Sequence, residues 1–293
     1  MKLLGCPQRF NLAIVRGLRK SLLDSRMEFG SAVHVFLKYK YDDAGDGFAL
    51  EKALEYWDTR VSQGMVVNEC DFRDRGHLYL TCVQYSLAYV KDKFKIAKID
   101  GKAATEMSFA IPVAADDQTE IILCGTIDAI GTLYGQRVFM DHKSTSTRGT
   151  YIPTFFRSYE LNTQMLTYNY ALSRVSEMYP DTFDWASNLP CIINGIFLAK
   201  GNNKYERSGI IEFSSTVREA FERQLENTFK ELLDSVRDNS WPLKGLVNDG
   251  CQSKFGMCEF SDICGRPEGV LEEDVVSLHY KTVPYDPMKH GKL

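Results

Sequence analysis

The chain has 293 residues, of which 44% are hydrophobic and 25% are charged. This composition is typical of a soluble globular protein with a substantial core and excludes a disordered or membrane protein. No apolar run approaches the roughly 18 residues that a membrane-spanning helix needs, so no membrane association is expected. The net charge of −4 gives no global argument for nucleic-acid binding, since phosphate-binding proteins often have an excess of Lys and Arg.

The first six residues, MKLLGC, leave no room for the apolar stretch of about 7–15 residues that export requires. We therefore expect a reducing compartment, the cytoplasm. Eight cysteines are then expected to be core residues or metal ligands rather than disulfides.

The first half of the chain changes from helical to strand-like patterns. Apolar side chains three or four apart predict helices at 27–40, 50–63 and 74–91. Short segments rich in Ile, Val and Phe predict strands at 105–113, 120–130 and 138–143. The residues 131–136 would join the last two strands as a hairpin.

The second half continues this alternation. A helix is expected at 159–178, strands at 191–198 and 209–213, and a further helix at 215–237. This order predicts an α/β fold with a mixed sheet flanked by helices, in which 42–98 forms a helical lobe or insertion.

Two acidic residues and a lysine lie at the ends of adjacent predicted strands. Asp128 ends the segment Gly125-Thr126-Ile127-Asp128, and Asp141-His142-Lys143 ends the next strand. Because strand residues two apart share a face, Asp141 and Lys143 project together while His142 turns away. Hairpin pairing would bring Asp128 beside them.

Two carboxylates that converge on one point suit Mg²⁺ or Mn²⁺. Such an ion can polarise a phosphoryl oxygen and lower the pKa of bound water, and Lys143 can orient that water or stabilise developing charge. The alternative is a strand-end carboxylate pair with Lys143 in an exposed salt bridge, since Asp-x-Lys is common by chance. The apolar strand before Asp141 and the Gly-x-x-Asp motif at hairpin distance favour the metal site.

These motifs resemble the signature of the PD-(D/E)XK nuclease superfamily, Gly-x-x-Asp followed by Asp-x-Lys. They are similar in particular to its RecB-like branch, which adds an upstream histidine, a glutamate before Gly-x-x-Asp and a Gln-x-x-x-Tyr helix. The matching residues here are His34, Glu106, Gln164 and Tyr168. The resemblance implies a restriction-endonuclease-like fold and a metal-dependent nuclease.

The resemblance also implies a role for each residue. Asp128 and Asp141 would bind the metal with help from His34 and Glu106, Lys143 would act on water or developing charge, and Gln164 and Tyr168 would position the substrate. The residue patterns alone are also compatible with purely structural roles. Gln164 and Tyr168 share a helix face but could be half-buried core residues, His34 could be a core histidine, and Glu106 could merely end a strand.

Three cysteines near the C-terminus, Cys251, Cys258 and Cys264, lie in a stretch with few apolar side chains, which is not typical of a core. A tetrahedral thiolate site needs a fourth ligand, and Cys6 is the candidate. The other cysteines have apolar neighbours and are expected to be small buried hydrophobes: Cys70, Cys82, Cys124 and Cys191.

This arrangement resembles AddB-type and CRISPR-associated RecB-like nucleases, in which one N-terminal and three C-terminal cysteines hold a [4Fe–4S] cluster. In that group the C-terminal trio opens with Cys-x-x-Cys, whereas six residues separate Cys251 from Cys258 here, so Zn²⁺ is an alternative. We expect the iron–sulfur cluster, because zinc ribbons usually present Cys-x-x-Cys pairs. Its expected role is structural, joining the two ends of the chain.

We therefore expect a single nuclease domain over 1–264, with a catalytic sheet core at 100–200, the cysteine site at 251–264 with Cys6, and a tail at 265–293. The expected activity is metal-dependent cleavage of DNA, as an exonuclease in recombination, repair or CRISPR-type DNA processing. The alternative is a non-catalytic nucleic-acid-binding module that keeps the fold and the cluster.

Two arginines after the lysine, Arg148 and Arg157, are candidates for phosphate contacts, although surface salt bridges would account for them equally well. The chain has no Gly-x-x-x-x-Gly-Lys-Ser/Thr loop. A helicase, recombination or adaptation partner would therefore be a separate protein.

Overall fold

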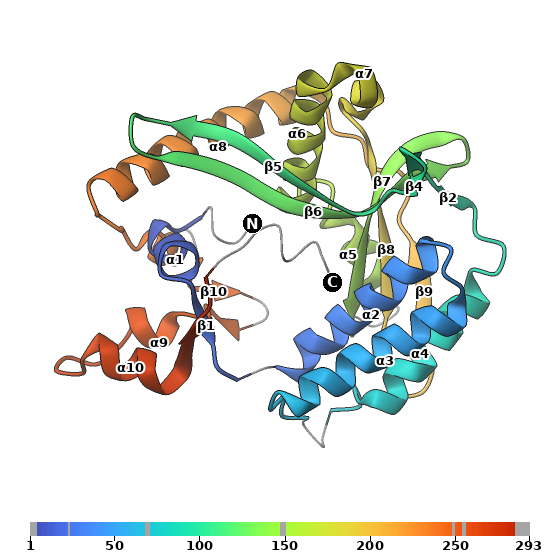
Figure 1. The fold of residues 1–293 in the computed structure, drawn as a ribbon, viewed down its shortest axis with the longest axis horizontal. Helices are drawn as coiled ribbons and strands as arrows, with labels where there is room; N and C mark the ends of the chain where they lie inside the picture. Colours follow the sequence, from blue (N-terminus) through green and yellow to red (C-terminus); the bar gives the residue numbers. More distant parts are fainter. Residues whose placement is uncertain are drawn as a thin grey trace. The chain divides into compact units, whose positions relative to one another are not determined.

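The fold is described from a computed structural model, which describes residues 5–22, 24–67, 71–146, 151–247, 250–253 and 256–284 (Figure 1). The contacts within the chain separate it into two compact units. One, the sheet unit, comprises Leu23–Phe109 and Cys124–Arg218. The other, the cysteine unit, comprises Met1–Leu22, Ala110–Leu123 and Glu219–His290. Each is described by itself.

Three consecutive helices form one layer of the sheet unit: α2 (Ser25–Tyr41), α3 (Asp46–Ser62) and α4 (Arg75–Ala88). Acidic side chains cap two of them, since Asp24 accepts a hydrogen bond from the Arg26 backbone N at 2.9 Å and Asp74 accepts one from the His77 backbone N at 2.7 Å. Each cap satisfies a donor that the first helical turn leaves free. The three predicted helices are confirmed, with ends shifted by a few residues.

A mixed sheet forms the second layer, with six strands among the described residues in the order β2-β6-β7-β8-β9 and β5 paired beside β6. The β7–β8 pair is parallel, whereas β2–β6, β6–β7 and β8–β9 are antiparallel. The strands are β2 (Phe94–Ile96), β5 (Thr105–Ala115), β6 (Glu120–Leu133), β7 (Gln136–Thr145), β8 (Cys191–Phe197) and β9 (Lys204–Arg207). Two short strands, β3 (Lys98–Ile99) and β4 (Lys102–Ala103), pair separately.

A two-residue turn joins β6 to β7 and is tighter than the predicted connection. The last pair of the ladder is Leu133 with Gln136, and the two residues between them, Tyr134 and Gly135, have φ of 52° and 87°. Two positive φ angles are typical of a type I′ turn, whose twist matches that of the strands. The hairpin is therefore confirmed, while Gly131 lies inside β6 instead of in the connection.

The two faces of β7 contact different layers. Val138 and Met140 join the hydrophobic core that includes Trp57 of α3 and Leu78 of α4. Phe139 points the other way, and its ring meets Tyr168 edge to face at 6.1 Å. Helices therefore cover both faces of this sheet, as the α/β prediction requires (Figure 1).

The segment between β7 and β8 contains α5 (Ile152–Arg157), α6 (Thr163–Met178), α7 (Pro180–Phe183) and the 3₁₀ helix η3 (Asp184–Ala186). The predicted helix at 159–178 begins later than expected, at Thr163, because the Asn162 side chain caps it by accepting from the Gln164 backbone N at 2.9 Å. This cap fixes the end of α6 that carries Gln164.

The predicted strand at 209–213 is wrong. The edge strand is β9 (Lys204–Arg207), and Ile211 forms only an isolated bridge with Cys191. Polar contacts hold this strand, since the Tyr205 hydroxyl donates to the Thr81 carbonyl at 2.9 Å and Arg207 forms an ion pair with Asp92. A pattern of apolar residues cannot reveal a strand stabilised in this way.

The cysteine unit joins the two ends of the chain. Strand β1 (Leu18–Lys20) pairs antiparallel with β12 (Tyr280–Thr282), which lies in the predicted tail. Its other elements are α1 (Pro7–Phe10), the short π-helix η1 (Asn11–Val15), η4 (Lys244–Leu246), β10 (Gln252–Ser253), β11 (Gly256–Met257), α9 (Ser261–Cys264) and α10 (Glu272–His279). A small core of Leu12, Phe260 and Ile263 packs between them.

Helix α8 (Ser215–Arg237) has the predicted bounds and buries Leu225, Phe229 and Leu232, which recur at helical spacing. Across the described segments of the chain, no helix is both long and apolar enough to cross a bilayer.

Candidate active site

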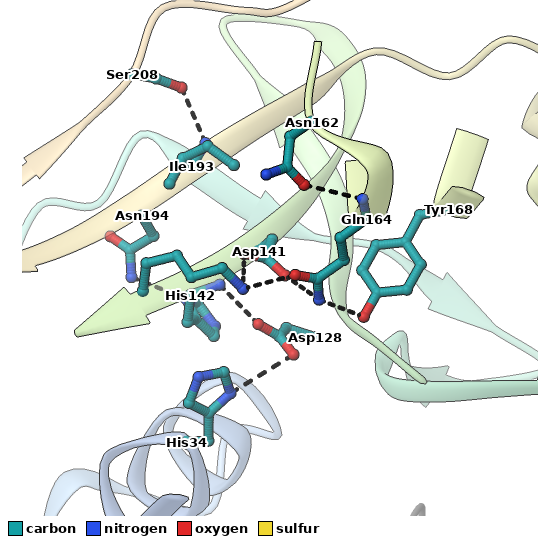
Figure 2. A network of polar contacts seen from close by, with 11 residues as sticks. His34, Asp128, Asp141, His142, Asn162, Gln164, Tyr168, Ile193, Asn194 and Ser208 are labelled. Carbon is teal, nitrogen blue, oxygen red and sulfur yellow. Dashed lines mark hydrogen bonds and ion pairs between the residues drawn. The ribbon is translucent and has the colours of Figure 1, made fainter. Parts of the chain in front are cut away.

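Strands β6 and β7 bring the two predicted carboxylates together where their ladder ends, at the pair Ala129–Met140. Beyond this pair the Asp128 carboxylate accepts a hydrogen bond from the His142 backbone N at 2.6 Å. Asp128 and Asp141 are both buried, with 9% and 1% of their surface exposed. Figure 2 shows Asp128 between His34 and the backbone of β7.

Three side chains from three elements form a group that fits a metal ion. One donor atom from each of His34, Glu106 and Asp128 lies within 4.8 Å of the other two, and His34 Nδ1 is 3.5 Å from Asp128 Oδ1. Two carboxylates and one imidazole suit a divalent cation that prefers oxygen but accepts nitrogen, such as Mn²⁺ or Mg²⁺. The chemistry of these donors therefore fits the predicted metal.

Glu106 reaches this group through an unusual backbone conformation. It lies in β5 but has φ of 45°, in the left-handed region that residues other than glycine rarely adopt. Such a conformation costs on the order of 1–3 kcal/mol and is common at functional sites. The strand is thus distorted at the residue that supplies a candidate ligand.

The charges of this group are strongly coupled. Burial disfavours a charged His34, but the Asp128 carboxylate more than offsets it and raises the pKa of His34 to about 9. Burial also opposes ionisation of Asp128, yet His34 holds the pKa of Asp128 below its ordinary value. Burial raises the pKa of Glu106 to about 7, and the Asp128 charge adds to this effect. A divalent cation would displace the protons from His34 and Glu106.

Asp141 faces helix α6 and belongs to a closed polar network (Figure 2). Lys143 Nζ lies 2.6 Å from Asp141 Oδ2 and donates to Gln164 Oε1 at 3.2 Å. Gln164 Nε2 in turn donates to Asp141 Oδ1 at 3.3 Å and to the Tyr168 hydroxyl at 2.8 Å. Residues of β7 and α6 that the sequence singled out therefore hold one another in place.

The ionisation states of this network define what Lys143 can do. Burial disfavours its ammonium, but Asp141 and Asp128 raise the pKa of Lys143 above its ordinary value. Burial raises the pKa of Asp141 to about 6 against the pull of Lys143, and the Asp128 charge adds to that rise. Lys143 is thus a cation at neutral pH, which can orient water or stabilise negative charge but cannot act as a base.

The glycine of the Gly-x-x-Asp motif leaves space for an aromatic ring. A Cβ atom added to Gly125 would lie 2.6 Å from Cζ of the half-buried Phe109 ring, so that ring would have to shift. The Phe109 ring meets Tyr168 edge to face at 6.2 Å. Gly125 therefore leaves room for a ring that supports the tyrosine of the network.

A buried layer behind Asp128 was not expected from the sequence. The His142 ring stacks on Tyr41 at 5.7 Å and 8°, and its Nδ1 lies 2.8 Å from Asn194 Nδ2. Arg207 donates to the Tyr41 hydroxyl at 2.8 Å. This layer fixes His142, whose backbone holds Asp128. One feature of the sequence indicated this layer: side chains alternate between the two faces of β7, so His142 points away from Asp141.

Of the two arginines predicted to contact phosphate, the structure describes only Arg157. Arg157 is exposed at the end of α5, and its side chain has no ion pair among the described residues. Arg148 lies outside the described residues. Sequence reasoning also missed Tyr159, a half-buried residue in the turn after α5 that interacts electrostatically with Lys143 and Asp141.

The four predicted cluster cysteines all belong to the cysteine unit. Cys6 is buried, Cys251 and Cys258 are half-buried, and Cys264 is exposed. Although the residue is exposed overall, partial desolvation of its sulfur raises the pKa of the Cys264 thiol to about 11, with the other three cysteines contributing. Within the described segments, no three of these sulfurs lie within 4.8 Å of one another. Among the other cysteines, Cys82 and Cys191 are buried, Cys124 is half-buried, and Cys70 lies outside the described residues.

Comparison with known proteins agrees with this chemistry. The signature of the PD-(D/E)XK nuclease superfamily matches residues 2–265, which defines the chain as a metal-dependent nuclease. The chain belongs to the PD-(D/E)XK nuclease superfamily. No curated protein matches it. Of the solved structures, the crystal structure of SSO0001 matches with 9% identity over 72% of this chain and 77% of that one, at a TM-score of 0.27, a similarity that carries no argument.

Proposed function

We propose that this nuclease is a DNA exonuclease of the RecB-like branch and that both units serve one nuclease domain. The observation that carries the proposal is the convergence of His34, Glu106 and Asp128 on one point, with Asp141 and Lys143 on the neighbouring strand. Gln164 and Tyr168 on α6 also match the helix expected in that branch.

The side chains divide the work of hydrolysis. Asp128, Glu106 and His34 would hold Mg²⁺ or Mn²⁺. Asp141, which interacts electrostatically with Asp128 and His34, would be the further ligand that the motif implies. When bound, the ion supplies electrostatic stabilisation of the phosphoryl group and a more acidic water. Lys143, held by Asp141 and Gln164, presents its ammonium to the water or to the charge that grows on the phosphate.

For the cysteine unit we propose a [4Fe–4S] cluster on Cys6, Cys251, Cys258 and Cys264, with Zn²⁺ as the alternative. The sequence spacing favours the cluster, because six residues separate Cys251 from Cys258, whereas zinc ribbons usually present Cys-x-x-Cys pairs. The pairing of β1 with β12 supports a structural role at the joined chain ends.

The proposed setting is DNA recombination, repair or CRISPR-type processing in the cytoplasm, beside a separate helicase, recombination or adaptation protein. No partner site is assigned.

The decisive experiment is cleavage of end-labelled single- and double-stranded DNA by protein purified without oxygen. Wild type and Lys143→Ala are compared in Mg²⁺, Mn²⁺ and EDTA, and iron content and visible absorption are recorded for each preparation. Metal-dependent cleavage that Lys143→Ala abolishes supports the proposal, and single-nucleotide products support exonuclease action.

The competing function is a non-catalytic nucleic-acid-binding module. It is favoured if cluster-loaded wild-type protein binds DNA yet cleaves neither substrate. The polar network around Lys143 argues against it, because binding alone has no need for a half-buried lysine paired with a buried carboxylate.

A further inference from the structure

An aromatic cluster lies beside the catalytic lysine and has no role in the chemistry described so far. Its four members are Phe155, Phe156, Tyr159 and Phe197. The Phe155 ring contacts Phe156, Tyr159 and Phe197 at 5.5, 5.2 and 5.2 Å, and Phe156 contacts Phe197 at 5.7 Å. All four contacts are edge to face.

The register of the sheet places this cluster next to Lys143. In the parallel β7–β8 pair, Lys143 is matched with Gly195. A Cβ atom on Gly195 would lie 2.7 Å from the Phe197 ring and 3.1 Å from Phe156. Matched residues of neighbouring strands are about 4.8 Å apart and point to the same face. The rings of Phe156 and Phe197 therefore pack against Gly195, on the strand next to the one that carries Lys143.

Part of the cluster is accessible. Phe197 is buried, with 3% of its surface exposed, and anchors the others to the sheet. Phe155, Phe156 and Tyr159 are only half-buried. A cluster that only attached α5 to the sheet would be expected to bury its rings. The partial exposure of three rings beside Lys143 leaves aromatic surface that a ligand can contact.

Tyr159 adds a hydrogen-bond donor. Its hydroxyl has no hydrogen-bond partner among the residues that the structure describes. Burial raises the pKa of Tyr159 to about 12 even though Lys143 acts in the opposite direction, so the phenol keeps its proton at any working pH. A phenol of this kind can donate to a phosphate oxygen.

We propose that Phe155, Phe156 and Tyr159 form a nucleobase subsite, where the base next to the scissile phosphate stacks while the Tyr159 hydroxyl donates to a phosphate oxygen. Aromatic side chains bind unpaired bases in this way, because the base faces are covered in a duplex. The subsite therefore selects DNA whose strand is unpaired at the scissile phosphate. This inference rests on the proposed DNA nuclease function.

The test is binding of single-stranded oligonucleotides that carry 2-aminopurine at successive positions, in Mg²⁺ and with Lys143→Ala to prevent cleavage. Quenching is expected at one or two adjacent positions. Phe155→Leu and Tyr159→Leu, made in that background, should remove the quenching and weaken binding roughly 5- to 150-fold, the range for one lost stacking contact. Tyr79→Leu, which changes an aromatic residue that is 47% exposed on α4, is the matched control and should change neither.

Two further measurements separate the roles of ring and hydroxyl. An oligonucleotide with an abasic nucleotide at the quenched position should bind Lys143→Ala more weakly than the intact oligonucleotide does. The double variant Lys143→Ala/Phe155→Leu should bind the two oligonucleotides with equal affinity. Tyr159→Phe should keep the quenching in the Lys143→Ala background, because the ring remains, and should lower the cleavage rate of the otherwise wild-type enzyme.

The proposal is overturned if no position is quenched, if the abasic penalty is the same with and without Phe155→Leu, or if a blunt duplex binds as tightly as the single strand. Failure of the nuclease function looks different. Wild-type protein would then show localised quenching without cleavage, which supports the subsite and rejects the catalytic role of Lys143.

Discussion

His34 Nδ1 lies 3.5 Å from Asp128 Oδ1, although the two residues belong to different layers of the sheet unit. The other oxygen of Asp128 accepts a hydrogen bond from the His142 backbone N at 2.6 Å. Asp128 is therefore fixed from two sides before any metal arrives. A ligand that needs no rearrangement binds its metal with less loss of conformational entropy.

Metal binding is expected to tighten as the pH rises from about 6 to about 9. Protonated Glu106, with a pKa of about 7, and protonated His34, with a pKa of about 9, must each lose a proton before they can bind a cation. Binding should therefore release protons throughout this range. Calorimetric titration with Mn²⁺ in buffers of different ionisation enthalpy measures the number released.

Glu106→Gln is the informative variant for this prediction. It should remove the rise in affinity near pH 7 and keep the rise that His34 causes at higher pH. A wild-type affinity that does not change between pH 6 and pH 8 would contradict the assigned ligands.

Gln164→Leu is expected to lower kcat roughly 10- to 100-fold, the usual loss when a group that orients an active-site residue is removed. Gln164 bridges Lys143 and Asp141, so its loss removes one of the two contacts that hold the ammonium and leaves only the ion pair with Asp141. Steady-state cleavage at saturating metal measures the effect. Gln224→Leu, an exposed glutamine on α8, is the control and should retain full activity.

Much of this site could be predicted from the sequence, because several of its residues lie close together in the chain, within two adjacent strands. A glycine before Asp128 and a lysine two residues after Asp141 can be read directly from two adjacent strands. The positive φ of Glu106 could not be predicted, since nothing in the neighbouring residues requires it. Asn194 was equally hidden, because its role depends on contact with a histidine on another strand.

Gly125→Ala is expected to destabilise the protein by about 1 kcal/mol, the lower end of the cost of overpacking, because the Phe109 ring is only half-buried and can shift. The new methyl group would meet the Phe109 ring, which must then move away from Tyr168. Urea denaturation measures the free energy of unfolding, and cleavage should fall together with it.

The double variant Gly125→Ala/Phe109→Leu decides whether this clash is the cause. Leucine removes the ring, so much of the lost stability should return. If the double variant is no more stable than Gly125→Ala alone, another contact is responsible.

The ion pair behind the active site should make stability depend on pH. Arg207 donates to both oxygens of Asp92, at 2.7 Å for Nη2, and both side chains are largely buried. Although burial favours the neutral acid, these hydrogen bonds hold the pKa of Asp92 below its ordinary value. A carboxylate of this kind adds stability above its unfolded pKa of about 3.9, and this contribution is lost as the pH falls through the lower folded pKa.

Arg207→Met is therefore expected to cost about 3–5 kcal/mol at pH 7, because Asp92 is left buried without its cation. The loss should shrink as the pH falls, because burial without Arg207 favours the protonated form of Asp92 in the variant. Metal affinity should fall as well, since Arg207 also holds Tyr41, on which His142 stacks. Urea denaturation from pH 7 to pH 3, with Mn²⁺ titration at pH 7, measures both effects.

Lys204→Met provides a control within the same strand. Its salt bridge to Glu206 is exposed, with 57% and 36% of the two side chains accessible, so its loss should cost at most about 1 kcal/mol. If Arg207→Met costs no more than Lys204→Met, the buried pair does not support the sheet. If its cost is the same at pH 7 and pH 3, the loss comes from packing and not from the charge of Asp92.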